Sequence, residues 1–310
     1  MPTVEVAERA GTVRSEDRVV VLPQAIVLLD GATMLTPREQ NGGWYAERLA
    51  NELARRLPGR GDDLRAILAE AISTLVSRHD LTPGDSPSST VALLRWDDEI
   101  VEALVLADSP VVAFTDSGVR PVTDDRLAGL RSSRRSSAPD SGDQAGRGGA
   151  TSADPPRAAT VGAAASGAAS SEESSTSRGF RERLRTGGGF DGGHREALGA
   201  AMSRTARLRN VPGGFWVAEA LPAAAWEAVV SSWPRSEVRE VLLASDGVSC
   251  GVDDYGLFAD WNALADRART AGVQAVLDDV RAAEESDPDG RRWPRAKRHD
   301  DQSLVRVVLG

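Results

Sequence analysis

The feature that most restricts the fold is a run of short apolar segments between residues 90 and 122, separated by very short polar turns. The segments read STVALLRW, IVEALVLADS, PVVAFT and VRPVT, and the turns contain DDE and DSG. Such short connections join only antiparallel neighbours, because parallel strands need a crossover of a dozen or more residues. The run therefore predicts an antiparallel sheet and argues against a doubly wound parallel one.

Apolar periodicity predicts further strands and helices on both sides of this run. Helices are indicated where apolar residues recur every three or four positions, and strands where short apolar runs lie between turn residues. Strands and helices fall in separate groups, which is typical of a layered α+β domain. The predicted elements are strands over 18–22 and 25–29, helices over 42–57, 62–79 and 194–210, a helix beginning near Pro222, a strand over 237–247, helices over 257–272 and 273–287, and a closing strand over 303–309.

A low-complexity segment divides the chain between residues 131 and 193. It consists mainly of Ser, Ala, Gly, Pro and Arg. Such a segment buries too little apolar surface to offset the entropy of ordering it, so we expect a disordered insertion. Neither flanking part has a complete sheet and core of its own. We therefore expect one domain over residues 11–310 that contains the insertion, preceded by an N-terminal tail at 1–10.

Composition excludes several classes of function. The formal net charge of -9 argues against a nucleic-acid partner. No apolar run approaches the ~20 residues that span a bilayer, so we expect no membrane partner. The N-terminus lacks a basic segment followed by an apolar one, and the expected location is the cytoplasm. Cys250 is the only cysteine, which excludes internal disulfides and thiolate metal clusters.

Aspartates recur at the ends of the predicted strands. Asp30, Asp108 and Asp246 each follow an apolar run, and Asp300 directly precedes the last one. One Asp-Gly pair alone is a common turn, but buried carboxylates need a positive partner to repay their desolvation. Oxygen ligands without His or Cys suit Mg²⁺ or Mn²⁺. Two such ions about 4 Å apart can activate water for an in-line displacement.

The order of these motifs resembles the type-2C protein phosphatases, the metal-dependent (PPM-type) serine/threonine phosphatases. The resemblance covers the chain from about residue 11 to the end, apart from the insertion. No single motif is specific, but six in the same order are. The matching motifs are Glu16-Asp17, Asp30-Gly31, Ser88-Ser89-Thr90, Ala107-Asp108-Ser109, Ser245-Asp246-Gly247 and Asp300-Asp301-Gln302-Ser303.

The resemblance implies a sandwich of two antiparallel β-sheets flanked by α-helices (α-β-β-α), with two Mn²⁺ or Mg²⁺ ions in a cleft at one end. It implies that Asp30 bridges the two ions and that the Gly31 carbonyl ligates one of them. Asp246 and Asp300 would hold the other ion. Asp30, Asp246 and Asp300 are therefore the implied catalytic residues, because they would hold the ions that activate water.

The resemblance also implies an outer set of residues. Glu16 and Asp17 would act through waters on the metals, and Asp108 matches a weaker third-metal site of some family members. Arg14 is the candidate for phosphate binding, although its spacing to Glu16-Asp17 is shorter than in the family.

The sequence departs from the family pattern near the bridging carboxylate. The family's Asp-Gly-x-Gly-Gly is Asp-Gly-Ala-Thr here, and the glycine pair is displaced to Gly42-Gly43. Ala32 replaces a general-acid histidine of some members. Pro110 replaces the arginine that follows Gly-Asp-Ser.

The hypothesis favoured by the resemblance is a metal-dependent phosphatase that acts on phosphoserine or phosphothreonine. Two alternatives remain open. One is a catalytically weak or inactive module of the same fold that binds a protein partner. The other is a phosphatase of a small phosphorylated metabolite. The implied partner is accordingly a phosphorylated protein or a small phosphate ester.

Overall fold

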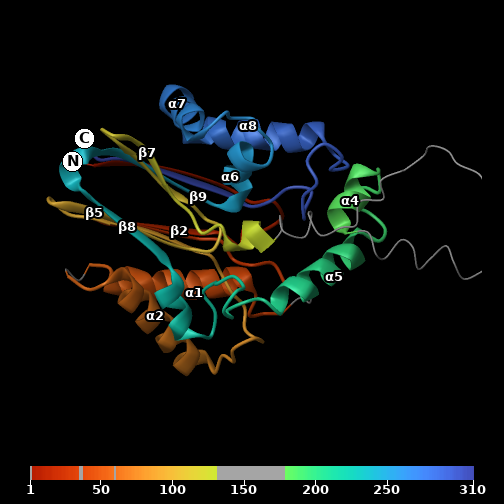
Figure 1. The fold of residues 1–310 in the computed structure, drawn as a ribbon, viewed down its shortest axis with the longest axis horizontal. Helices are drawn as coiled ribbons and strands as arrows, with labels where there is room; N and C mark the ends of the chain where they lie inside the picture. The colour runs from red at the N-terminus through yellow and green to blue at the C-terminus, as the bar shows by residue number, and fades with distance from the viewer. Residues whose placement is uncertain (1, 35–37, 59–60, 131–178) are drawn as a thin grey trace, which may run out of the picture.

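Two five-stranded antiparallel sheets lie between two layers of helices (Figure 1). The computed structural model describes residues 2–34, 38–58, 61–130 and 179–310. One sheet has the strand order β1-β10-β9-β6-β7 and the other β2-β3-β4-β5-β8. The strands are β1 (Thr3–Arg9), β2 (Arg18–Leu22), β3 (Ala25–Leu29), β4 (Val91–Trp96), β5 (Ile100–Leu106), β6 (Val111–Thr115), β7 (Gly118–Val122), β8 (Val229–Pro234), β9 (Val238–Ala244) and β10 (Gln302–Val308).

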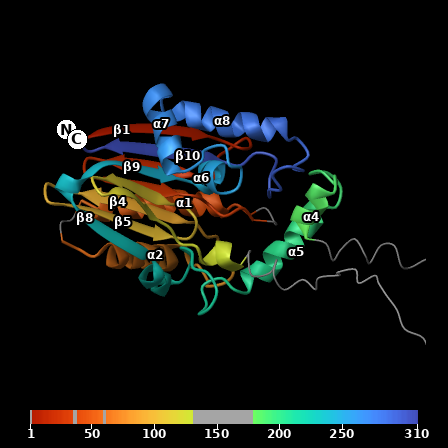
Figure 2. The same ribbon diagram turned by 45° about the horizontal axis from the view of Figure 1, so that its top comes forward.

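Helices cover the outer face of each sheet, as Figures 1 and 2 show. Helices α1 and α2 pack on the sheet that contains β3, and α7 and α8 pack on the sheet that contains β10. This α-β-β-α arrangement confirms the fold class predicted from the sequence. The helices are α1 (Gly42–Arg56), α2 (Leu64–His79), α4 (Phe180–Arg185), α5 (His194–Ala206), α6 (Asp246–Asp253), α7 (Trp261–Ala271) and α8 (Val273–Ser286), with 3-10 turns η1 (Pro222–Glu227) and η2 (Arg235–Glu237).

Strand β3 shows how the sequence produces this layering. All five of its residues are buried. Val27 and Leu29 pack in the core against α1 and α2, whereas Ile26 and Leu28 pack in the core between the two sheets. Alternate side chains of a strand point to opposite faces, so a continuous apolar run serves two cores at once. Each such side chain contributes ~1.5–3 kcal/mol by burial.

The predicted antiparallel run between residues 90 and 122 is present but divides between the sheets. Strands β4 and β5 pair with each other in one sheet, and β6 and β7 pair in the other. The short segment between β5 and β6 therefore crosses from one sheet to the other. Both sheets also contain strands from the C-terminal part of the chain, so neither part has a complete sheet without the other.

Residues 1–10 were predicted to be a tail, but Thr3–Arg9 form β1. This strand pairs with β10 in continuous register, from Thr3 opposite Val308 to Arg9 opposite Gln302. Its sequence is short and contains only three apolar residues, Val4, Val6 and Ala7, which gives a weak strand pattern. An edge strand depends on backbone pairing with its neighbour, and the sequence pattern does not report that pairing.

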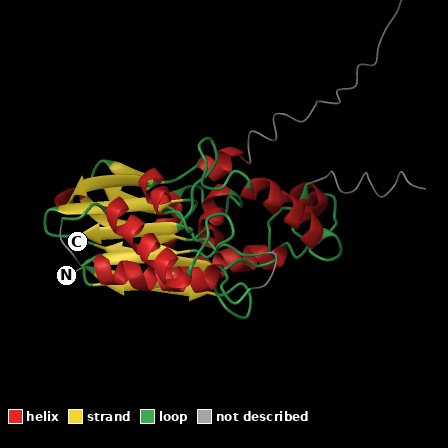
Figure 3. Ribbon diagram, turned by 90° about the horizontal axis from the view of Figure 1, so that it is seen from below, coloured by secondary structure: helices red, strands yellow, loops and turns green. Residues whose placement is uncertain are grey.

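The predicted disordered insertion extends too far at its C-terminal end. Residues 131–178 lie outside the described part of the structure, but 179–193 contain α4, in which Leu184 is fully buried. Figures 1 and 3 show α4 and α5 at the end of the sandwich opposite the two chain termini. The expected helix at Pro222 is also wrong beyond its first turn. Only η1 forms there, and Val229–Pro234 make edge strand β8, because β-branched Val229 and Val230 favour a strand.

Among the described residues, no helix has both the length and the apolar character that a membrane span requires.

Candidate active site

Four carboxylates of the predicted metal site meet at the end of the sandwich opposite the chain termini. Asp17 precedes β2 and Asp30 follows β3, both in one sheet. Asp246 follows β9 and Asp300 precedes β10, both in the other sheet. The carboxylates therefore converge between the two sheets, at one end of the sandwich. Each sheet contributes two of them.

Neighbouring hydroxyls fix the backbone of Asp30. The Asp30 amide donates to Thr90 Oγ1 at 3.0 Å, and the Asp30 carbonyl accepts from the Thr90 amide at 2.9 Å. The Ser89 hydroxyl donates to the same carbonyl at 2.9 Å. Thr90 Oγ1 in turn lies 2.6 Å from Ser109 Oγ. These contacts give the Ser88-Ser89-Thr90 motif a positioning role beside Asp30.

Gly31 and Gly42 pack backbone against backbone. A Cβ on Gly31 would lie 2.4 Å from the Gly42 carbonyl carbon, and a Cβ on Gly42 would lie 2.4 Å from the Ala32 carbonyl oxygen. Only glycine permits such a close approach. The Gly42 backbone therefore lies directly against Gly31 in space, although the two are separated in the sequence. The departure from the family pattern in sequence is therefore small in space.

Asp17 is a buried carboxylate without a hydrogen bond. Its residue is 1% exposed, and neither carboxylate oxygen has a hydrogen-bond partner among the described residues. The hydroxyls of Ser303 and Ser245 lie near enough to favour its charge without making a bond of normal geometry. The adjacent Glu16 is half-buried and accepts a hydrogen bond from Thr33 Oγ1 at 2.7 Å.

Asp301 anchors the loop that carries Glu16 and Asp17. Its Oδ1 accepts from the Gly11 amide at 2.7 Å, and its Oδ2 accepts from the Glu16 amide at 2.9 Å. The Asp301 carbonyl also lies close to Gly247, where an added Cβ would be 1.9 Å from it. Asp301 thus links the first, fifth and sixth motifs of the sequence, a positioning role that the sequence had not revealed.

Burial and mutual repulsion raise the pKa values of three of these carboxyl groups. Burial, followed by the charges of Asp17, Asp246 and Asp300, raises the pKa of Asp30 well above its usual value. Burial, followed by Asp300 and Asp108, raises the pKa of Asp246 to about 8. Burial, followed by Asp301 and Asp300, raises the pKa of Asp17 to about 6. The site therefore stabilises positive charge.

Asp108 lies on the rim of this cluster, in the crossing between the two sheets. Its charge raises the pKa of Asp246, so the two carboxylates are close. Ala107, which replaces the glycine of the family motif, keeps a left-handed conformation with φ of 69°. The buried Asp124 accepts from the Ala107 amide at 3.0 Å and stabilises this strained turn. Asp124 is a second positioning residue that the sequence did not reveal.

Arg14, the candidate for phosphate binding, is exposed in the loop before Glu16 and makes no ion pair among the described residues. A cleft of about 500 Å³ opens beside the cluster, and Asp108, Asp246 and Asp300 line it. Arg181 of α4 and Arg295 line the same cleft, whereas Arg14 is not among the residues that line it.

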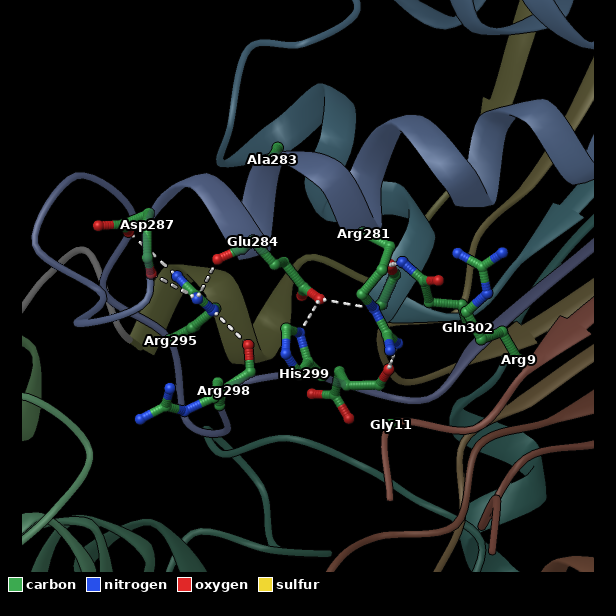
Figure 4. A network of polar contacts seen from close by, with 12 residues as sticks. Arg9, Gly11, Arg281, Ala283, Glu284, Asp287, Arg295, Arg298, His299 and Gln302 are labelled. Atoms are coloured by element: carbon green, nitrogen blue, oxygen red, sulfur yellow. Dashed lines mark hydrogen bonds and ion pairs between the residues drawn. The ribbon is translucent and has the colours of Figure 1, made fainter. Parts of the chain in front are cut away.

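A network of polar contacts beneath α8 holds the chain directly before Asp300 (Figure 4). Glu284 is 1% exposed, and its Oε2 lies 3.1 Å from His299 Nδ1 and 3.2 Å from Arg281 Nε. Arg281 Nη2 donates to the Asp300 carbonyl at 3.0 Å. Figure 4 shows His299 turned toward Glu284, and His299 does not line the cleft. This network orients the Asp300 backbone.

The donor atoms of the cluster fit a hard divalent cation. All are carboxylate oxygens, the two of Asp17 lack partners, and Asp30 lies within hydrogen-bonding reach of Asp246. Each of these features destabilises the ionised form of the carboxyl groups unless a cation binds between them. In the part of the chain that the structure describes, no three His, Cys, Asp or Glu side chains form a ready-made ion site as they are placed.

No protein-family model matches the sequence, and no curated protein matches it. Solved structures do match. The Mycobacterium tuberculosis serine/threonine phosphatase PstP/Ppp aligns with a TM-score of 0.52 and 14% identity over 99% of this chain and 98% of that chain. Stp1 from Staphylococcus aureus aligns with a TM-score of 0.54 and 10% identity, over 100% and 96%. The catalytic domain of PstP in complex with two manganese ions aligns with a TM-score of 0.50 and 13% identity, over 99% and 97%.

At these identities the likeness defines the fold. The chain has the fold of the PPM-type serine/threonine phosphatases. The resemblance found in the order of the sequence motifs is confirmed at the level of the fold.

Proposed function

We propose that this protein is a divalent-metal-dependent phosphatase of phosphoserine and phosphothreonine residues. The observation that carries the proposal is the convergence of Asp17, Asp30, Asp246 and Asp300 from both sheets, with pKa values raised by burial and mutual repulsion for the first three. The fold, shared with serine/threonine phosphatases of which one is solved with two manganese ions, supports it further.

In this proposal, Asp30 would be shared by two Mn²⁺ or Mg²⁺ ions and the Gly31 carbonyl would help to hold one of them. Asp246 and Asp300 would hold the other ion, and Asp108 would hold a third. When bound, the ions activate a water and neutralise the charge of the phosphate. Ser89 and Thr90 keep the Asp30 backbone in place through their hydrogen bonds.

Asp301 positions the two remaining carboxylates. Asp301 holds the loop of Glu16 and Asp17 against the start of β10, and those two carboxylates act on the metals through waters. Ala32 supplies no proton, so the leaving serine or threonine oxygen takes its proton from water. The substrate phosphate enters through the cleft beside Asp108, where Arg181 and Arg295 attract its charge.

The test is metal-dependent hydrolysis of an aryl phosphate and of phosphoserine peptides, compared with Asp30→Asn. We expect turnover with Mn²⁺, none with excess chelator, and a loss of about 100-fold or more in Asp30→Asn, because the variant lacks the charge shared by both ions. Calorimetric Mn²⁺ titration should show a parallel loss of affinity, with the fold of the variant unchanged by circular dichroism. Equal metal binding by both proteins would refute the two-metal site.

A second candidate function is a phosphatase-fold module without catalysis that binds a protein partner. One observation favours it: the Lys297 ammonium lies 2.7 Å from Asp300 Oδ1 and already neutralises a predicted ligand. Absence of turnover on every phosphopeptide at saturating Mn²⁺, with metal binding intact, would support this second function.

A further inference from the structure

Lys297 is the only lysine of the chain, whose other cationic side chains are arginines and three histidines. This single ammonium lines the same cleft as Asp246 and Asp300. Its Nζ lies 2.7 Å from Asp300 Oδ1, and both side chains are about three-quarters buried, with 27% and 28% exposed. The one lysine therefore lies beside the carboxylate cluster.

The charge of Lys297 acts on the whole cluster rather than on Asp300 alone. Burial disfavours the ammonium, but Asp300, Asp30 and Asp246 together raise the pKa of Lys297 above its usual value. In the opposite direction, Lys297 lowers the pKa of both Asp30 and Asp246. A cation that stabilises the charged form of three predicted ligands performs the electrostatic part of a metal's role.

The loop of Lys297 is held on both sides. Before it, Arg181 Nη1 donates to the Pro294 carbonyl at 2.7 Å, and His194 Nε2 lies 2.8 Å from the Ala296 carbonyl. After it, the Arg298 carbonyl accepts from Arg295 Nε at 2.9 Å. Helices α4 and α5 supply the first two contacts, so tertiary packing directs the lysine into the cluster.

We propose that the Lys297 ammonium is the resident counter-ion of this site and competes with a divalent ion for Asp300. Binding of the ion at Asp300 then requires the ammonium to leave, and Lys297 lowers the affinity of the site for divalent cations. This inference rests on the proposed function, because it takes Asp300 as a metal ligand.

A lysine suits a displaceable counter-ion better than an arginine. The ammonium is a compact point charge on a flexible stem, whereas a guanidinium forms a planar, bidentate pair with a carboxylate. Within the described residues, the head group makes a single hydrogen bond, to Asp300 Oδ1. The cleft next to it has room for the side chain to swing aside.

Calorimetric titration with Mn²⁺ tests the proposal in wild type, Lys297→Gln and Lys297→Arg. Arg298→Gln is the matched control, since it removes a positive charge from the adjacent, exposed residue, which makes no ion pair among the described residues. We expect Lys297→Gln to bind Mn²⁺ on the order of tenfold more tightly, the effect of removing one competing charge. Lys297→Arg keeps the charge and pairs more firmly with Asp300, so it should bind Mn²⁺ no more tightly than wild type, whereas Arg298→Gln should resemble wild type.

The outcomes separate the inference from the proposed function. Unchanged or weaker Mn²⁺ binding by Lys297→Gln, with clear binding by wild type, overturns the inference alone. An equal gain in affinity in Arg298→Gln also overturns it, because the effect would then come from overall charge. No Mn²⁺ binding by any of the four proteins overturns the proposed two-metal site and the inference with it.

A second measurement uses the unmodified side chain. Lysine labelled with ¹³C at Cε gives one signal in this protein, because the chain has one lysine. Titration with diamagnetic Mg²⁺ should shift that signal toward the value of a solvent-exposed lysine, and Mn²⁺ should broaden it. A signal that keeps its position at Mg²⁺ concentrations that saturate the calorimetric binding curve would refute displacement of the ammonium.

Discussion

Replacing Asp17 by Asn should stabilise the metal-free protein at neutral and alkaline pH. Asp17 is 1% exposed and both of its carboxylate oxygens lack hydrogen-bond partners among the described residues. Its charge is further disfavoured by Asp301 and Asp300. Asn has the same size and no charge, so the substitution removes the repulsion and leaves the packing unchanged.

The magnitude follows from the pKa. Burial and the neighbouring carboxylates raise the pKa of Asp17 from its usual 3.8 to about 6. One pKa unit corresponds to ~1.4 kcal/mol, so the charged carboxylate costs about 3 kcal/mol of folding free energy above pH 6. A buried amide without partners costs ~1–2 kcal/mol in its turn. We expect Asp17→Asn to be more stable by about 1–2 kcal/mol, or ~2–6 °C in Tm.

The stability difference between Asp17→Asn and wild type should depend on pH. A carboxyl group whose pKa is raised in the folded state binds more protons when folded, so its contribution to stability is complete below pH 3.8. That contribution is lost as the pH rises from 3.8 through about 6. The advantage of Asp17→Asn over wild type should therefore be complete well above pH 6 and absent near pH 4, where the cost of the buried amide makes the variant the less stable protein.

Thermal unfolding followed by circular dichroism, in excess chelator at pH 4, 6 and 8, measures the difference. Asp62→Asn is the control, because Asp62 is exposed and makes no ion pair among the described residues. Adding Mn²⁺ should reverse the order, since wild type gains more stability from the ion. If Asp17→Asn is less stable than wild type at pH 8 in chelator, the charged Asp17 carboxylate does not destabilise the metal-free protein and the prediction is wrong.

Two further substitutions test how the site is held together. Asp301→Ala should destabilise the protein by at least about 3 kcal/mol, because the carboxylate accepts two hydrogen bonds and each such bond contributes ~1.5–3 kcal/mol. Urea unfolding and faster hydrogen exchange at the Gly11 and Glu16 amides should show this loss, and unaltered exchange at both amides would contradict the anchoring role. Gly247→Ala places a Cβ 1.9 Å from the Asp301 carbonyl oxygen and should lower the free energy of unfolding by at least ~2 kcal/mol in the same assay. Gly129→Ala is the control, because its Cβ would have no atom within 4 Å, and it should unfold like wild type. Equal stability of the two variants would contradict the close approach.

Local patterns in the sequence were sufficient for most of the architecture. The helices over 42–57 and 62–79 and the strands over 18–22 and 25–29 appear at nearly the predicted bounds. Their apolar residues repeat with the period of the element, and burial follows that repeat. Strand β1 and helix α4 were missed, because an edge strand and a two-turn helix bury few side chains of their own.

The candidate ligands were visible in the sequence, but their surroundings were not. An Asp after an apolar run identifies Asp30 and Asp246 individually. The closeness of these two carboxylates to Lys297 depends on how the two sheets pack. The hydrogen bond between Gly11 and Asp301 depends on the register of β1 with β10. One signal was present and unused, namely that the only lysine lies three residues before Asp300.

The sequence by itself determined the α+β class, the antiparallel strands and the aspartates at strand ends, because periodicity and turn residues act over a few positions. Tertiary structure decided that each sheet contributes two carboxylates, that Gly42 returns to Gly31, and that an ammonium shares the site. Some of these features join segments that lie nearly the whole chain apart in the sequence. Only the packing of the two sheets brings their charged side chains close together.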